Sequence, residues 1–169
     1  MKKLIQLTLA GMMFATMSLS AQQDTKSFVK QYQKQDGFTT VTIGKPAMRM
    51  LSLFARIGDK EASQLLKHVN AIQVLSFERG WDKNRCKTFS SEALAFCDAN
   101  GYEELIEVVE YNETVKIFCK TEKDAITGLI ILNRSNRSSS AEMVCINGKF
   151  TFDDIQSITE GVGKNIAKL

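Results

Sequence analysis

The segments Thr114–Lys120 (TVKIFCK), Ile126–Asn133 (ITGLIILN) and Glu142–Asn147 (EMVCIN) decide how this chain folds. Each contains a run of β-branched or aromatic residues, which favours a β-strand. The linkers between them are too short for a crossover connection, so neighbouring strands must run antiparallel. We therefore predict a β-meander in this part of the chain.

Outside the meander, the sequence predicts three more strands and several helices. The strands are Thr39–Ile43, Ala71–Glu78 and Tyr102–Val109, and the helices are Pro46–Gly58, Asp59–Val69, Asp82–Ala99 and one that begins at Thr151. The segment Tyr102–Val109 also fits a helix, but its Ile and Val content favours a strand. The order β-α-β-α-β-β-β-β-α indicates an α+β domain, with a mainly antiparallel sheet and helices packed on one face.

The strand Thr114–Lys120 predicts which side chains face the core. We expect Val115 and Ile117 to point into the core and Lys116 to point outward, because side chains alternate along a strand. Phe118 then interrupts the polar row on the outer face. This partly apolar outer face is a hint of a binding surface, although single exposed aromatic residues are common.

Residues 1–21 have the pattern of a secretory signal peptide. Lys2 and Lys3 form a charged start, an apolar run follows, and small residues precede a predicted cleavage site after Ala21. The apolar run is shorter than the roughly 20 residues needed to span a bilayer. We expect export to the periplasm or cell envelope, with no transmembrane segment in the mature chain.

The mature chain divides into a lead-in and one domain. Residues 22–37 are a polar N-terminal lead-in, and residues 38–169 are predicted to form a single α+β domain. Within the lead-in, Phe28, Val29 and Tyr32 have the spacing of a short amphipathic helix that docks weakly. The alternative is a frayed segment.

The charge balance argues against nucleic acid as a partner. The sequence has 22 Lys and Arg residues against 19 Asp and Glu, and two of the lysines lie in residues 1–21. The mature chain is therefore almost neutral, whereas a nucleic-acid-binding surface needs concentrated positive charge. We predict no nucleic-acid binding.

His68 is the one histidine of the chain, which excludes any metal site that needs two imidazoles. A Ser-His or Cys-His nucleophilic arrangement would depend on this residue alone. We expect His68 at the surface or at a helix end. No catalytic residue, metal site or cofactor is predicted.

Four cysteines in an exported chain raise the question of disulfides. Cys86 and Cys97 lie on one predicted helix, about 16 Å apart, and cannot pair. Cys119 and Cys145 lie on strands of the meander and are the candidate disulfide. We expect instead that the thiols fill the core as small apolar side chains.

Charged side chains occur in two further groups. Glu103, Glu104, Glu107 and Glu110 are interpreted as a solvated row along the strand Tyr102–Val109. Arg134 and Arg137 lie in a Ser- and Asn-rich loop and could contact an anionic partner, with a solvated loop as the alternative.

Five short motifs connect the sequence with a family. They are Val41–Met48 (VTIGKPAM), Ile72–Glu78 (IQVLSFE), Gly101–Leu105 (GYEEL), Val115–Phe118 (VKIF) and Ile146–Ile155 (INGKFTFDDI). With them the chain resembles the exported bacterial domain-of-unknown-function 4252 family, from about residue 38 to residue 158. The resemblance implies a small envelope protein with this α+β layout and no established activity, partner or site.

These observations favour a non-enzymatic interaction module of the cell envelope, whose uncovered sheet face or edge binds another protein. A homo-oligomer is also open. The first alternative is a carrier that holds a small apolar ligand between the helices and the sheet. The second is a hydrolase or thiol enzyme that uses His68 or a cysteine.

Overall fold

The computed structural model describes residues 24–50, 67–123 and 125–151. Its elements in chain order are α2 (Thr25–Tyr32), β1 (Phe38–Ile43), β2 (Val69–Phe77), α5 (Lys83–Ala99), β3 (Glu103–Val109), β4 (Glu113–Glu122), β5 (Ala125–Ser135) and β6 (Ser140–Phe150). A short helical segment at residues 45–50 follows β1. The predicted helix Asp59–Val69, the helix after Thr151 and the signal peptide lie wholly or largely outside the described residues.

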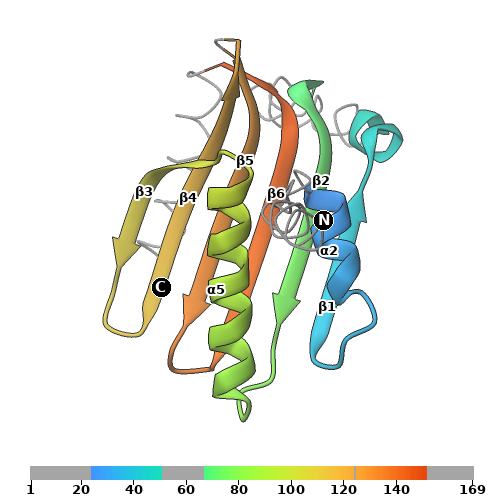
Figure 1. Cartoon of the computed structure of the whole chain (residues 1–169). Helices are drawn as coiled ribbons and strands as arrows, with labels where there is room; N and C mark the ends of the chain where they lie inside the picture. The colour runs from blue at the N-terminus through green and yellow to red at the C-terminus, as the bar shows by residue number, and fades with distance from the viewer. Residues whose placement is uncertain (1–23, 51–66, 124, 152–169) are drawn as a thin grey trace, which may run out of the picture.

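All six strands join one antiparallel sheet in the order β1-β2-β6-β5-β4-β3 (Figure 1). Short turns connect β3 to β4, β4 to β5 and β5 to β6, so these strands lie side by side as the meander predicts. β2 pairs with the free side of β6 and β1 pairs with β2. Within the described residues β1 and β3 are therefore the two edges of the sheet. The predicted α+β class is confirmed.

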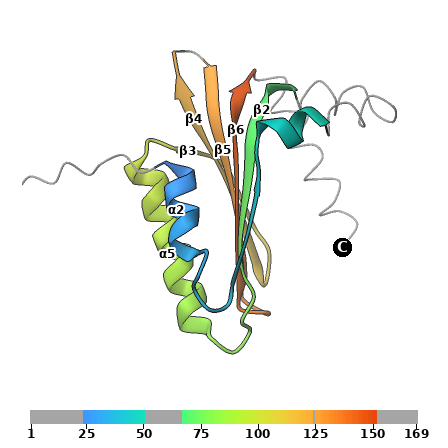
Figure 2. The ribbon, with the colours of Figure 1, turned by 90° about the vertical axis from the view of Figure 1, so that its right-hand side faces the viewer.

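α2 and α5 pack on the same face of the sheet (Figure 2). α5 begins where the Asp82 side chain accepts a hydrogen bond from the Arg85 N–H, and it ends at Asn100. Gly101 follows with a φ of +71°, a conformation that favours glycine at a helix end. The apolar side chains that α5 buries are Cys86, Phe89, Ala93, Phe96 and Cys97. The helix predicted for Asp82–Ala99 is confirmed.

The short amphipathic helix predicted within the lead-in is confirmed, but its predicted weak docking is wrong. Residues 25–32 form α2, and its Phe28, Val29 and Tyr32 are at least 95% buried. The Phe28 and Phe96 ring centroids lie 4.5 Å apart, and those of Tyr32 and Phe38 lie 4.8 Å apart. Because the three residues fill the space over β1 and β2, α2 belongs to the core of the domain. The predicted boundary at residue 38 separates it from that core.

The face assignment of β4 is also wrong. Phe118 is 4% exposed and belongs to the core under the helices, whereas Ile117 and Cys119 lie on the opposite face. The alternation was misleading because both faces of β4 carry buried apolar side chains. We call the face opposite α2 and α5 the second face. Phe118 is therefore no part of a binding surface there.

The second face has an apolar cluster of its own at one end. Its buried members are Met48, Val69, Cys119, Ile126, Leu129 and Phe150. Met48 comes from the helical segment at residues 45–50, which lies on this side of the sheet (Figure 2).

No helix in the described ranges is long and apolar enough to cross a membrane.

Candidate functional site

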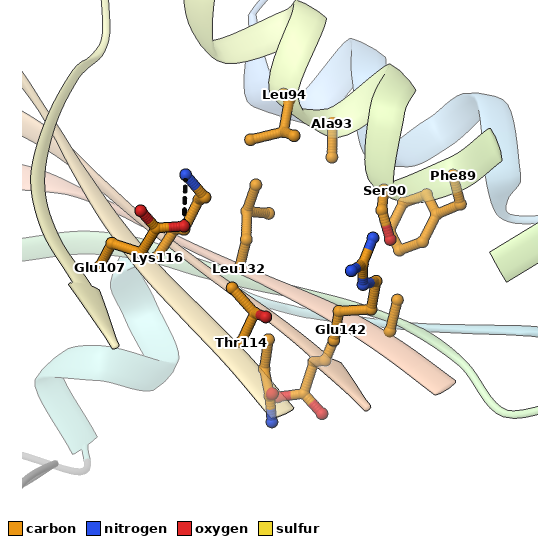
Figure 3. Close-up of a pocket in the computed structure, with 12 residues that line it drawn as sticks. Phe89, Ser90, Ala93, Leu94, Glu107, Thr114, Lys116, Leu132 and Glu142 are labelled. Atoms are coloured by element: carbon orange, nitrogen blue, oxygen red, sulfur yellow. Dashed lines mark ion pairs between the residues drawn. The ribbon is translucent and has the colours of Figure 1, made fainter. Parts of the chain in front are cut away.

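A cleft of about 190 Å³ opens between α5 and the sheet (Figure 3). We call it the α5 cleft. α5 packs over β5 and β6, and the cleft lies where its cover ends towards β3 and β4 (Figure 1). Its lining residues are Phe89, Ser90, Ala93, Leu94, Glu107, Thr114, Lys116, Leu132, Asn133, Arg134, Ala141 and Glu142.

Small side chains on both walls create the space. Ser90 and Ala93 line the cleft from α5, and Ala141 lines it from β6. Leu132 points from β5 towards Leu94 and Ala93 (Figure 3). A larger residue in place of Ser90, Ala93 or Ala141 would occupy part of this space.

Lys116 is neutralised at the sheet wall of the cleft. Its Nζ lies 2.9 Å from a carboxylate oxygen of Glu104 and 2.9 Å from one of Glu107. These hydrogen bonds, first Glu107 and then Glu104, raise the pKa of Lys116. Two of the four glutamates predicted as a solvated row therefore form ion pairs.

Arg134 differs from the other cation of the cleft, Lys116, because it has no ion-pair partner within the described residues. β5 runs to Ser135, so Arg134 lies within the sheet, paired with Thr114 and Ala141, and not in the predicted loop. Its Nε is buried and has no hydrogen-bond partner. None of the ion pairs within the described ranges includes Arg134. The cleft therefore combines an apolar wall with an unpaired cation.

Sequence reasoning missed the α5 cleft, although it singled out Arg134. The signal was available in β5, where Arg134 follows Ile130 and Leu132 on the same face by alternation. Arg137, its predicted companion, is exposed in the turn before β6. The two arginines are thus not brought together in one site.

The β1 edge is a second candidate feature. Gly37 O accepts a hydrogen bond from Glu78 N, which fixes the phase of the ladder between β1 and β2. Because hydrogen-bonded pairs alternate in an antiparallel ladder, Val41 then bonds to β2, while the N–H and C=O groups of Thr40 and Thr42 point away from the sheet. β1 contains no charged residue and no bulge.

The cysteines are spread over both faces of the sheet. Cys119 lies on the second face, Cys145 lies under the helices, and β5 separates their strands. Two strand spacings exceed the roughly 7 Å limit between disulfide-bonded Cα atoms. All four thiols are free and buried, so the candidate disulfide does not form. Burial raises the pKa of Cys97 and of Cys145 to about 12, which leaves both as unreactive thiols.

His68 is exposed just before β2. The depression beside it is lined by Lys67, Asn70, Ala125, Ile126, Lys149, Phe150 and Thr151. These described residues include no cysteine or serine that His68 could activate. In the described part of the chain, no three His, Cys, Asp or Glu side chains gather as a metal site.

Comparison with known proteins identifies the family of the chain. A search of curated proteins found no match, and neither did a search of solved structures. The family model "Domain of unknown function (DUF4252)" matches residues 32–158, which include all six strands and α5. The chain therefore belongs to the DUF4252 family.

Proposed function

We propose that this protein is a non-enzymatic interaction module of the bacterial envelope, which binds an extended segment of another envelope protein along β1. The observation that carries the proposal is the outward-pointing backbone of Thr40 and Thr42 on an edge strand without charge or bulge. Such an edge accepts an additional strand through main-chain hydrogen bonds. Export is part of the proposal and rests on the signal-peptide pattern of residues 1–21.

The side chains of β1 define the partner's chemistry. Val41 is 46% exposed, and Thr39 and Thr42 are exposed beside it. An added strand would place its own side chains opposite these small, β-branched residues. We therefore expect the partner segment to be uncharged and rich in Val, Ile or Thr.

The test compares two substitutions at Thr42. Thr42→Pro removes the outward N–H, whereas Thr42→Val keeps it and removes only the hydroxyl group. With the mature protein as bait in envelope extracts, we expect one specific partner to be captured by wild type and Thr42→Val and lost with Thr42→Pro. Hydrogen exchange of the Thr40 and Thr42 amides should slow in the complex.

Several results would contradict this proposal. One is a partner that Thr42→Pro still binds, and another is unchanged exchange at Thr40 and Thr42 in the complex. A dimer of the chain that Thr42→Pro dissociates would replace the foreign partner with a second copy. A cooperative thermal unfolding transition of both variants, well above the temperature of the binding assay, is the control for folding.

A second candidate function is a carrier of a small ligand, and the α5 cleft favours it. Native mass spectrometry of the gently purified protein should then show one bound compound per chain. Ser90→Leu, which narrows the cleft, should remove that compound. A protein that is always empty would contradict the carrier function. Burial of all four thiols argues against a thiol enzyme.

A further inference from the structure

We infer that the α5 cleft binds a small monocarboxylate with an apolar chain or ring, held through its carboxylate by Arg134. This inference rests on the second candidate function, the carrier, and names its ligand class. It draws on the apolar wall, the charge of Arg134 and the volume of the cleft.

The apolar part of the ligand has a defined surface to contact. Phe89, Ala93 and Leu94 line the cleft from α5, and Leu132 points towards them from β5 (Figure 3). Removing an apolar group of this size from water is favourable by roughly 25 cal/mol per Å². This apolar wall therefore favours a ligand with a hydrocarbon chain or ring.

The charge of the ligand follows from Arg134. A guanidinium presents a planar fork of donors that matches a carboxylate with two parallel hydrogen bonds. Arg134 forms no ion pair within the described ranges, and its Nε is buried without a hydrogen-bond partner. The outer N–H groups of the guanidinium are therefore the donors offered to a ligand carboxylate, which would balance the charge of Arg134.

The neighbouring charges restrict the ligand to one negative group. Lys116, the other cation of the cleft, already pairs with Glu104 and Glu107. The carboxylate of Glu142 points away from α5 (Figure 3), and Ser76 Oγ donates a hydrogen bond to it over 3.3 Å. A second anionic group on the ligand would be repelled by Glu107 and would have no unpaired cation in the cleft to bind.

The volume limits the size of the ligand. An engineered apolar cavity of about 150 Å³ accommodates benzene. A cleft of about 190 Å³ therefore fits one ring with a short acid arm, or a chain of comparable volume. Phenylacetate and octanoate are suitable probes.

The experiment measures binding of three matched compounds by calorimetry: phenylacetate, 2-phenylethanol and 2-phenylethylamine. We expect phenylacetate to bind at least tenfold more tightly than the alcohol and the amine to bind least. Arg134→Met should weaken phenylacetate binding at least tenfold, because a charge-assisted bidentate contact is lost. Arg137→Met is the matched control and should leave the affinity unchanged.

Each other outcome overturns the inference. These are no binding of phenylacetate, equal binding of all three compounds, unchanged phenylacetate affinity in a folded Arg134→Met variant, or an equal loss in Arg137→Met. The comparison of ligands on wild type remains decisive if Arg134→Met does not fold. A bound compound of other chemistry in native mass spectrometry, without phenylacetate binding, would refute the ligand class and leave the carrier function standing.

Discussion

β1 and β3 close opposite sides of the same sheet, yet they protect their free backbone groups differently. β3 carries exposed Glu103, Glu104 and Glu107, and a bulge shifts its register between Glu104 and Ile106. Charged side chains and bulges are the usual defences against pairing with another chain. β1 has neither. The contrast shows that β3 is protected against pairing with another chain, whereas the outer backbone groups of β1 are available to a partner strand.

The availability of β1 does not reflect weak attachment to the fold. Its six residues pair with β2 in continuous register, and Phe38 lies among the aromatic rings of Tyr32, Phe77 and Phe89. The strand is therefore anchored through one backbone side and one end. Its outer backbone groups and the exposed side chains of Thr39, Val41 and Thr42 are left for binding.

The largest expected effect comes from moving proline by one residue along β1. Val41→Pro removes an N–H that bonds to β2, so we expect a loss on the order of 1–3 kcal/mol in the free energy of unfolding. Thr42→Pro removes an outward N–H and should cost clearly less. Urea titration of both variants measures the difference. Equal losses would mean that the phase assigned to the ladder is wrong.

A smaller effect should follow from removing the defence of β3. Replacing Glu103, Glu104 and Glu107 together by Thr makes this edge resemble β1 in charge, and we expect concentration-dependent association of the chain. Light scattering after size-exclusion chromatography measures the mass. Thr39→Glu, which adds charge to β1, is the opposite change and should not associate. If this variant of β3 remains monomeric, the charges are not needed, and the bulge alone prevents β3 from pairing with another chain.

The smallest effect concerns the ion pairs of Lys116. Its pKa is raised in the folded state, so the stabilisation is complete below the ordinary value of 10.5 and is lost as pH rises through the folded value. Because the pair is partly exposed, we expect a contribution of at most about 1 kcal/mol. The difference in unfolding free energy between wild type and Lys116→Met should shrink above pH 10.5. A constant difference would assign the effect to packing alone.

Much of the fold could be predicted because the sequence contains clear signals for the ends of helices and for turns. Asp82 at one end and Asn100-Gly101 at the other mark α5, and short polar turns mark the meander. The α+β class followed from these patterns, and the family from the resemblance of five short motifs. What alternation could not decide was the facing of β4, because Phe118 and Ile117 are both buried on opposite faces.

The α5 cleft was harder to predict than the elements that form it. Arg134 and Ser90 are far apart in sequence, and only the pairing of β5 with its neighbours places the arginine under α5. Polar residues around Arg134 favoured a loop in the sequence. The Nε of Arg134 lacks a hydrogen-bond partner only because of how the side chains pack, and this cannot be predicted from the amino-acid composition.

The positions of the cysteines have a practical consequence for following the motions of this protein. Cys119 belongs to the apolar cluster with Met48 on the second face, Cys97 lies on the buried side of α5, and Cys145 lies on β6 under the helices. A thiol reagent can label each only after the layer above it opens. The native chain thus carries its own reporters, and the order in which these thiols become labelled would tell which layer detaches first.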